Sequence, residues 1–153
     1  MDENYDDDQH IKEALETISE NYEGTLRSLS LSEWQDSVQK KYPHLRFDVA
    51  ECECELGWAN LLDPLFKYVN RWNAEELNGE HENPIFIEQV KVKFGTLRFY
   101  YSGGDEYFGG MVDYAEALSA KTCELCGNVG ECRGYHRTSC ERCCSISRSK
   151  LLD

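Results

Sequence analysis

The sequence predicts an α+β fold in which a small antiparallel sheet packs on helices and a zinc-ribbon-like module with four cysteine ligands ends the chain. Two observations predict it: residues 85–101 carry a β-hairpin pattern between helical segments, and two C-x2-C pairs follow near the C-terminus. We divide the 153 residues into a disordered acidic tail (1–8), an α+β domain (9–120) and a zinc-binding module (121–153).

The N-terminal elements follow from charge and apolar spacing. Residues 1–8 contain five acidic residues and no core former, which is typical of a disordered tail. Residues 9–22 place apolar side chains at helical spacing and predict an amphipathic helix. A shorter helix is predicted to begin at Ser30, where Glu33 completes a capping box, and to end before Pro43.

The next stretch predicts a strand, a helix and a loop. Residues 46–54 alternate between apolar and polar side chains, which favours a strand. Residues 57–72 carry the apolar spacing of a long buried helix. Pro64 suits the first position of a helix capped by Asp63, so we expect this helix to kink or restart there. Residues 73–84 are polar and predict a loop.

The hairpin pattern assigns one apolar and one polar face. A two-residue turn at Gly95-Thr96 pairs Val90 with Tyr101 and Val92 with Phe99 on the apolar face. The polar face, which we call the basic face, consists of Lys91, Lys93, Arg98 and Tyr100, and we predict it as a partner-binding surface. A helix from Met111 to Leu118 is expected to lead into the cysteine module.

The basic face needs an anionic neighbour. The predicted register sets Lys93 beside Arg98, and like charges directly opposite each other destabilise a strand pair. Three neighbours satisfy this requirement: an internal carboxylate such as Glu88 or Asp105, an acidic patch on a partner protein, or a nucleic acid phosphate.

The cysteine module predicts one structural zinc ion. Two C-x2-C pairs separated by thirteen residues are typical of a tetrahedral thiolate site, and Gly127 gives the first pair the backbone freedom that such a turn needs. Four thiolates leave no open coordination position, so the site is expected to be structural. The predicted ligands are Cys123, Cys126, Cys140 and Cys143.

Other ligand sets stay open. Cys132, Cys144 or His136 can replace one of the four ligands, because each lies within or beside the module. Cys52 and Cys54 face the same way on the predicted strand and can join Cys132 in a second metal site.

Three stretches together resemble a family of small uncharacterised proteins found in bacteria and their phages. They are GWANLL (57–62), VKVKFGTLRFYYSGGDE (90–106) and AEALSAKTCELCGNVG (115–130). The resemblance covers about the last two thirds of the chain. It implies a Gly-Trp helix start, the hairpin and the zinc-ribbon-like end, but no activity. Pro64 and the tail at 144–153 depart from the family pattern.

Charge and missing motifs decide between function classes. The net charge is −13, because residues 1–90 sum to −14 and the remaining residues to +1. The acidic part repels phosphate and favours a protein partner with a basic surface. No metalloprotease, phosphate-loop or nucleophile-elbow motif is present, so we expect no enzymatic activity. The start MDENYDDDQH differs from an export signal, and no apolar run has the length of a membrane span. We therefore expect a cytoplasmic protein with reduced thiols and no membrane association.

The sequence thus predicts an acidic, zinc-stabilised protein that binds and inhibits or regulates a partner protein, of the kind that phages or prophages encode for counter-defence or immunity. The alternative is a nucleic-acid-binding zinc ribbon that uses the basic face together with further arginines of the C-terminal module. These are Arg133, Arg137, Arg142 and Arg148.

Overall fold

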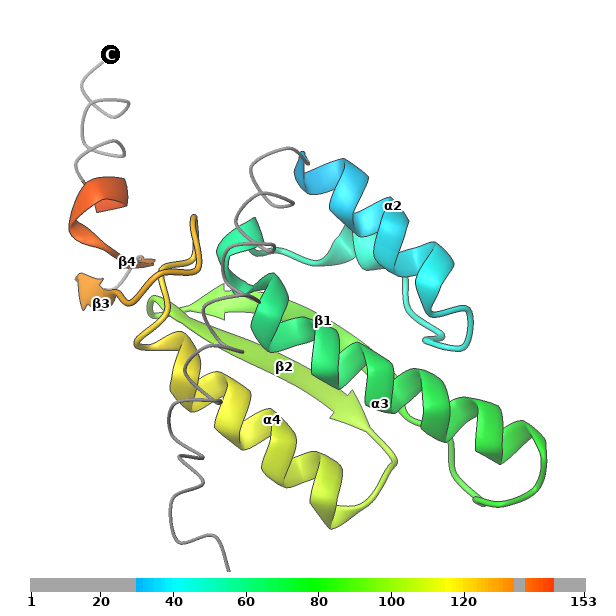
Figure 1. Cartoon of the computed structure of the whole chain (residues 1–153). Coiled ribbons are helices and arrows are strands. Elements are labelled where there is room, and N and C mark those ends of the chain that lie inside the picture. The colour runs from blue at the N-terminus through cyan, green and yellow to red at the C-terminus, as the bar shows by residue number, and fades with distance from the viewer. Residues whose placement is uncertain (1–29, 134–136, 145–153) are drawn as a thin grey trace, which may run out of the picture. The chain divides into compact units, whose positions relative to one another are not determined.

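The structure is a computed structural model of the 153-residue chain, and it describes residues 30–133 and 137–144 (Figure 1). The described residues from Leu31 onward form one compact unit. The predicted tail (1–8) and first helix (9–22) lie outside the described residues. The predicted α+β fold is confirmed, since the described part combines helices with two antiparallel two-stranded sheets and a cluster of four cysteines.

Helix α2 (Leu31–Lys41) begins and ends where the sequence predicts. It buries Trp34, Gln35 and Val38 on one side. The Trp34 ring packs 6.5 Å from the Phe66 ring of the following long helix, so α2 is held by aromatic packing.

The predicted strand at 46–54 is wrong. Val49–Glu51 form a short 3₁₀ helix (η1), because the Asp48 carboxylate accepts a hydrogen bond from the Ala50 N–H at 3.0 Å and favours a turn. The segment reaches the sheet at Glu53, which forms an isolated bridge with Lys91 of β1 and whose N–H donates to the Val90 carbonyl at 2.9 Å.

Helix α3 (Ala59–Leu77) follows a 3₁₀ turn, η2 (Leu56–Trp58), and contains Pro64 in its interior on an exposed position. The predicted cap at Asp63 is wrong, because the Asp63 carboxylate instead accepts a hydrogen bond from the Tyr42 hydroxyl at 2.9 Å.

The predicted loop at 73–84 is wrong for its first five residues, because helix α3 continues through them. Asn73 explains the difference, since it is fully buried and replaces missing backbone partners. Its amide nitrogen donates to the carbonyls of His44 (2.8 Å) and Ile85 (3.0 Å), and its oxygen accepts from the Ile85 N–H (2.8 Å). A polar residue that satisfies buried backbone groups thus extends the helix.

Strands β1 (Phe86–Lys93) and β2 (Thr96–Ser102) form the predicted hairpin, but the predicted register is wrong. The turn residues are Phe94 and Gly95, with φ angles of 52° and 80°. Positive φ at both central residues defines the turn that matches the twist of a two-residue hairpin, and it requires glycine or a tolerant residue. Each strand keeps the faces that the sequence predicts, but its residues pair with different residues of the other strand.

The pairing and one bulge place the apolar residues inward. Val90 pairs with Phe99 and Val92 with Leu97, and the register shifts between Ile87 and Gln89. Val90, Leu97 and Phe99 are buried.

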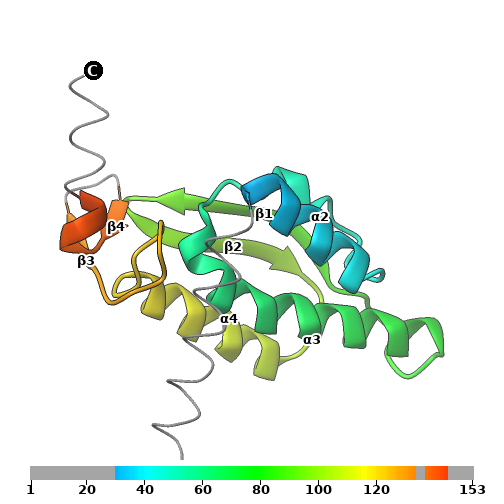
Figure 2. The same ribbon diagram turned by 45° about the horizontal axis from the view of Figure 1, so that its top comes forward.

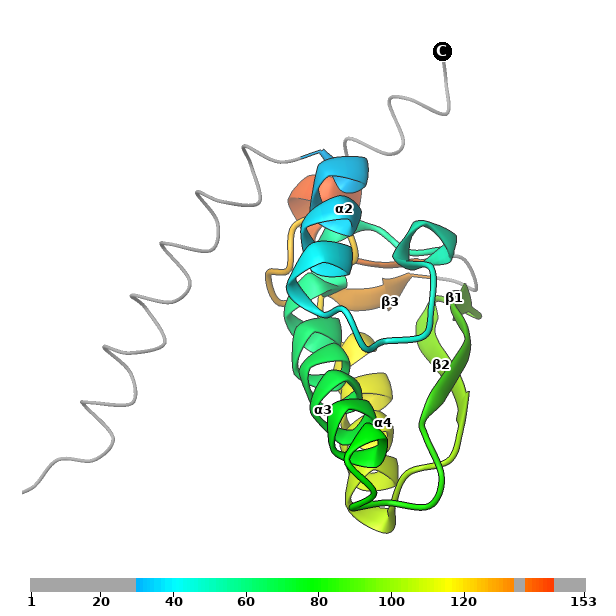
Figure 3. The same cartoon turned by 90° about the vertical axis from the view of Figure 1, so that its right-hand side faces the viewer.

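Helix α4 (Glu106–Ser119) is longer than predicted, because Asp105 caps it by accepting from the Phe108 N–H at 2.9 Å. Helices α3 and α4 lie on one face of the hairpin, as the side view shows (Figure 3). The Phe99 ring lies 6.4 Å from Phe66 of α3 and 6.1 Å from Phe108 of α4, so the core sits between sheet and helices. The opposite face of the hairpin carries no helix among the described residues (Figure 3).

Candidate metal centre and hairpin groove

The cysteine cluster is built from two turns and a short hairpin. Cys123 and Cys126 follow α4, and the Gly127 N–H donates to the Cys123 carbonyl at 2.9 Å to close the first turn. Gly127 has a φ angle of 81°, which favours glycine as the sequence predicted. Strands β3 (Glu131–Arg133) and β4 (Arg137–Ser139) then pair and bring the second cysteine pair back to the first.

The four predicted ligands are gathered in one place. The sulfurs of Cys123, Cys126, Cys140 and Cys143 all lie within 4.8 Å of one another, and the Cys126 and Cys140 sulfurs are 3.7 Å apart. A tetrahedral ion with metal–sulfur bonds of about 2.3 Å needs sulfurs about 3.8 Å apart. The cluster therefore has the size and donor set to hold a metal ion.

Ionisation of the cluster is uneven. Burial opposes ionisation of the Cys123 thiol, but N–H groups of Cys140, Cys126 and Leu125 offset it and lower its pKa to about 7. Burial and the neighbouring thiols raise the pKa of Cys143. A bound cation therefore has to displace protons from Cys126 and Cys143, since burial also raises the pKa of Cys126.

The alternative ligand sets are not assembled by the described side chains. Within them, the four-cysteine cluster is the one group of three or more His, Cys, Asp or Glu residues that could hold a metal. Cys52, Cys54 and Cys144 are free thiols outside it. His136 and the side chain of Cys132 lie outside what the structure describes.

The turn that carries Cys123 and Cys126, which we call the metal turn, is joined to the start of α3. The Gly57 N–H donates to the Glu124 carbonyl at 2.6 Å, and the Trp58 indole nitrogen donates to the Thr122 carbonyl at 2.9 Å. A β-carbon at Gly57 would overlap the Cys123 carbonyl oxygen, so only glycine allows this approach. The sequence offered a signal for this joint in its Gly-Trp pair, but the partner of that pair lies 64 residues away from Trp58 in the chain.

The cluster also contacts the hairpin turn. The buried Thr138 hydroxyl of β4 donates to the Gly95 carbonyl at 2.8 Å. Figures 1 and 2 both show β3 and β4 beside this end of the hairpin. Contacts thus cross the predicted boundary between 9–120 and 121–153 at two places.

The basic face has different neighbours from those predicted. Lys91, and not Lys93, lies opposite Arg98, while Lys93 pairs with Thr96. The predicted like-charge pair therefore exists, but Lys91 and Arg98 form it. The Lys91 ammonium lies 6.0 Å from the centroid of the Tyr100 ring, which stabilises a cation over an aromatic face.

An internal carboxylate does lie near Arg98, but it is Glu116 of α4 rather than Glu88 or Asp105. The Arg98 Nη1 atom is 4.0 Å from the Glu116 carboxylate and 2.8 Å from the Thr96 hydroxyl. The Asp105 carboxylate instead accepts hydrogen bonds from the Phe108 N–H, as the cap of α4, and from the Tyr68 hydroxyl.

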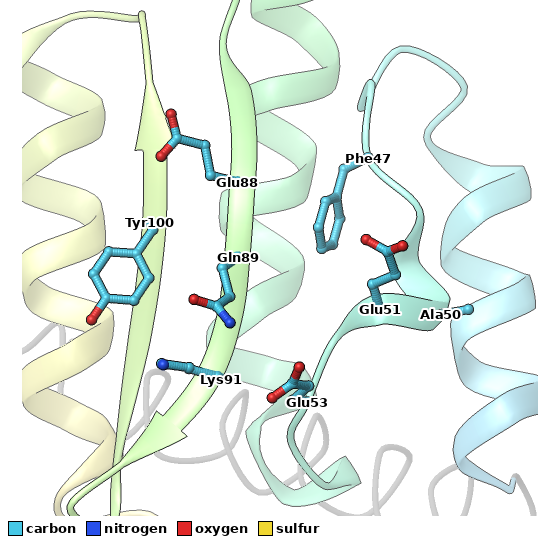
Figure 4. Close-up of a pocket in the computed structure, with 8 residues that line it drawn as sticks. All are labelled: Phe47, Ala50, Glu51, Glu53, Glu88, Gln89, Lys91 and Tyr100. Carbon is cyan, nitrogen blue, oxygen red and sulfur yellow. The ribbon is translucent and has the colours of Figure 1, made fainter.

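An open groove of about 730 Å³ lies beside β1, between this strand and residues 47–53 (Figure 4). Figure 4 shows Glu88, Gln89 and Lys91 of β1 on one wall and Phe47, Glu51 and Glu53 on the facing segment, with Tyr100 of β2 beside them. Ala50 completes the lining. Lys91 and Tyr100 of the predicted basic face thus line this groove, whereas Lys93 and Arg98 do not.

Carboxylates dominate the groove. Glu51, Glu53 and Glu88 are exposed, and no ion pair joins any of them to a Lys, Arg or His among the described residues. Sequence reasoning did not find this groove, because it treated 46–54 as a sheet strand. In the sequence, the acidic residues Glu51 and Glu53 were the signal that could have indicated this groove.

Comparison of the chain with family models, curated proteins and solved structures gives no match. The family resemblance therefore stays a prediction. Among the described residues, no helix combines the length and apolar character needed to cross a bilayer.

Proposed function

We propose that this protein is a non-enzymatic, zinc-stabilised binding protein that takes a basic, extended segment of a partner protein into the groove between β1 and residues 47–53. The groove supports this proposal most directly, because its three exposed carboxylates outnumber its one lysine. A partner cation entering the groove gains attraction without breaking an ion pair among the described residues.

Zinc is the metal that best suits the cysteine cluster. Four thiolates with tetrahedral spacing favour zinc over cations that prefer oxygen ligands. A site closed by four protein ligands has no position for substrate, so we assign it a structural role. Its ties to Gly57 and Gly95 support that role, because they connect the metal to both helix α3 and the hairpin.

The groove's aromatic walls suit lysine and arginine. Phe47 and Tyr100 line it together with the carboxylates. A basic side chain can lay its apolar stem or guanidinium plane on such a ring while its charge meets a carboxylate. The walls therefore favour basic side chains over small inorganic cations.

Inhibition or regulation follows if the bound segment is one that the partner uses for its own function. A strongly acidic chain, with a net charge of −13, presents the charge that a basic surface normally meets on nucleic acid. A cytoplasmic setting and a phage or prophage origin stay predictions.

The nucleic-acid alternative draws less support from the basic face. Arg98 already has Glu116 near it, and Lys91 stands beside the groove carboxylates. Both arrangements weaken the attraction for phosphate.

Fluorescence anisotropy with a labelled decapeptide of alternating arginine and threonine tests the proposal. We expect binding that weakens with added salt, and we expect Glu53→Gln or Glu88→Gln to weaken it by about threefold to tenfold. Glu82→Gln is the matched control, because Glu82 is exposed but lies outside the groove lining.

Two results would overturn the proposed groove. One is an equal loss of binding in Glu82→Gln, which would indicate nonspecific charge attraction. The other is absence of peptide binding at low salt together with tight, salt-sensitive binding of a DNA or RNA oligonucleotide, which would favour the nucleic-acid alternative.

A further inference from the structure

Two buried thiols flank one of the groove carboxylates. Cys52 and Cys54 are each 5% exposed, both are free, and neither belongs to the metal cluster. Glu53 between them is exposed and lines the groove. Because Glu53 lies in a β-bridge, its neighbours point together to the opposite side, so both thiols face the protein interior.

The segment that carries these thiols ties three parts of the fold together. The Cys52 carbonyl accepts from the Gln35 side chain of α2 at 3.4 Å. The Glu53 N–H donates to Val90 of β1 at 2.9 Å. The Glu55 N–H donates to the Glu124 carboxylate beside the metal turn at 3.2 Å. A change of backbone geometry at residues 52–54 therefore acts where helix, hairpin and metal turn meet.

We propose that Cys52 and Cys54 form a redox-sensitive dithiol, which a hydroperoxide converts to a disulfide and whose closure releases Glu53 from β1. In the first step one of the two sulfurs attacks the hydroperoxide ROOH, the O–O bond breaks, and a sulfenic acid forms with release of ROH, which is water when the oxidant is hydrogen peroxide. In the second step the other sulfur attacks the sulfenic sulfur, the S–O bond breaks, and water leaves. The two thiols lose two electrons and two protons, and the peroxide is reduced.

The Cys54 thiol lies close enough to Cys52 to be affected by it, because the neighbouring Cys52 thiol and then burial raise the pKa of Cys54. The disulfide that forms is the same whichever of the two sulfurs attacks the peroxide first.

Disulfide closure and the β-bridge from Glu53 to β1 require different backbone geometries at Glu53. Alternate residues of an extended strand are about 6.6 Å apart at Cα, at the long end of the roughly 4.4–6.8 Å that disulfides span. The two Cβ atoms have to approach to about 3.8 Å, which an extended Glu53 does not allow. The chain must contract at Glu53, and the hydrogen bond to Val90 is lost. A disulfide strained in this way is readily reduced, which is typical of a reversible switch.

Mass spectrometry of the intact, zinc-loaded chain tests the chemistry directly. The protein is titrated with hydrogen peroxide, alkylated with iodoacetamide and digested with trypsin. Cleavage after Arg46 and Lys67 yields a peptide, 47–67, that holds Cys52 and Cys54 and no other cysteine. We expect it to lose the mass of two hydrogen atoms, to escape alkylation, and to recover on treatment with dithiothreitol.

The proposal is overturned if peptide 47–67 stays fully alkylated while Cys144 or the metal thiolates are already oxidised. Pairing of either thiol with another cysteine overturns it as well. Cys52→Ser and Cys54→Ser should form no disulfide within this peptide. The wild-type measurement is decisive by itself if a variant fails to fold.

Hydrogen exchange tests the release of Glu53. Oxidation should raise exchange of the Glu53 amide at least tenfold, while the Leu97 amide, which donates to the Ser119 hydroxyl at 2.9 Å, keeps its protection. A disulfide that forms with unchanged Glu53 protection contradicts the release. None of these readouts uses the basic peptide, so failure of this inference is distinguishable from failure of the proposed function.

Discussion

The helical body and the cysteine end of this protein are stabilised in different ways. The body buries large side chains, among them Trp58, Phe66 and Phe108, which are fully inaccessible to solvent. The cysteine end has strands of three residues each, and its buried residues include Glu124 and Thr138. Apolar burial holds the body, whereas the described residues of the cysteine end bury little apolar surface, so we expect that end to need a bound metal ion to fold.

The joint between the two regions would extend the effect of a bound metal beyond the turn that carries its first two ligands. The start of α3 bonds to the turn between the first two ligands, and β4 bonds to the hairpin turn. Loss of the metal should therefore loosen the adjacent ends of α3 and the hairpin and spare the far end of the body.

The largest expected effect comes from Cys126→Ser or from removal of the metal with a strong chelator. Structural zinc sites supply on the order of 10 kcal/mol of folding free energy. Residues 122–133 and 137–144 should lose protection in hydrogen exchange, while the amides of α3 and α4 far from Gly57 keep theirs. If the whole chain unfolds in one transition with the metal, the two regions are not separable.

A second, large effect is expected at the joint itself. Gly57→Ala places a β-carbon on the Cys123 backbone and should cost about 3 kcal/mol, measured by urea unfolding of the zinc-loaded protein. Gly110→Ala is the matched control, because nothing lies within 4 Å of a β-carbon there. Within helix α4 it should stabilise by about 0.5–1 kcal/mol. Equal tolerance of both changes would mean that the joint is not closely packed.

Asn73→Ala should lower the stability of the helical body without changing metal binding. This change removes three hydrogen bonds to the backbone of His44 and Ile85 in a fully buried position. We expect a loss of about 2–3 kcal/mol in the free energy of unfolding, with unchanged zinc content. A loss of zinc in this variant would show that the two regions are coupled more tightly than their contacts indicate.

Sequence reasoning succeeded where one local pattern decides the structure. The two C-x2-C pairs named four ligands that the fold does bring together, because such spacing fixes the geometry of each pair. Helix α2 followed equally well from its apolar spacing and from Pro43.

Sequence reasoning failed where a single capping, buried or turn residue, and not the apolar pattern, decides the structure. The Asp48 cap turned alternating residues into a 3₁₀ helix, and the buried Asn73 carried α3 through a polar stretch. The hairpin turn moved by one residue because Phe94 accepts a positive φ angle. None of these outcomes is visible in apolar periodicity, and the groove depends on the first of them.

The smallest expected effects concern the basic face. Arg98→Thr removes the contact with Glu116 and should cost a few tenths to about 1 kcal/mol, as partly exposed ion pairs do. Lys93→Thr should change the free energy of unfolding by less than about 0.5 kcal/mol, because Lys93 is exposed and pairs with Thr96. Thermal melts of both variants, read side by side, check this order. The reverse order would show that Lys93 has an anionic neighbour in the fold.

The central claim, that four cysteines hold one structural zinc ion at this end of the molecule, is tested most directly by metal analysis. Freshly purified, reduced protein is measured by native mass spectrometry and by elemental analysis. We expect one zinc ion per chain in the wild type and none in a variant in which Cys123, Cys126, Cys140 and Cys143 are all serine. Wild-type protein that contains no zinc and still folds cooperatively would contradict the account.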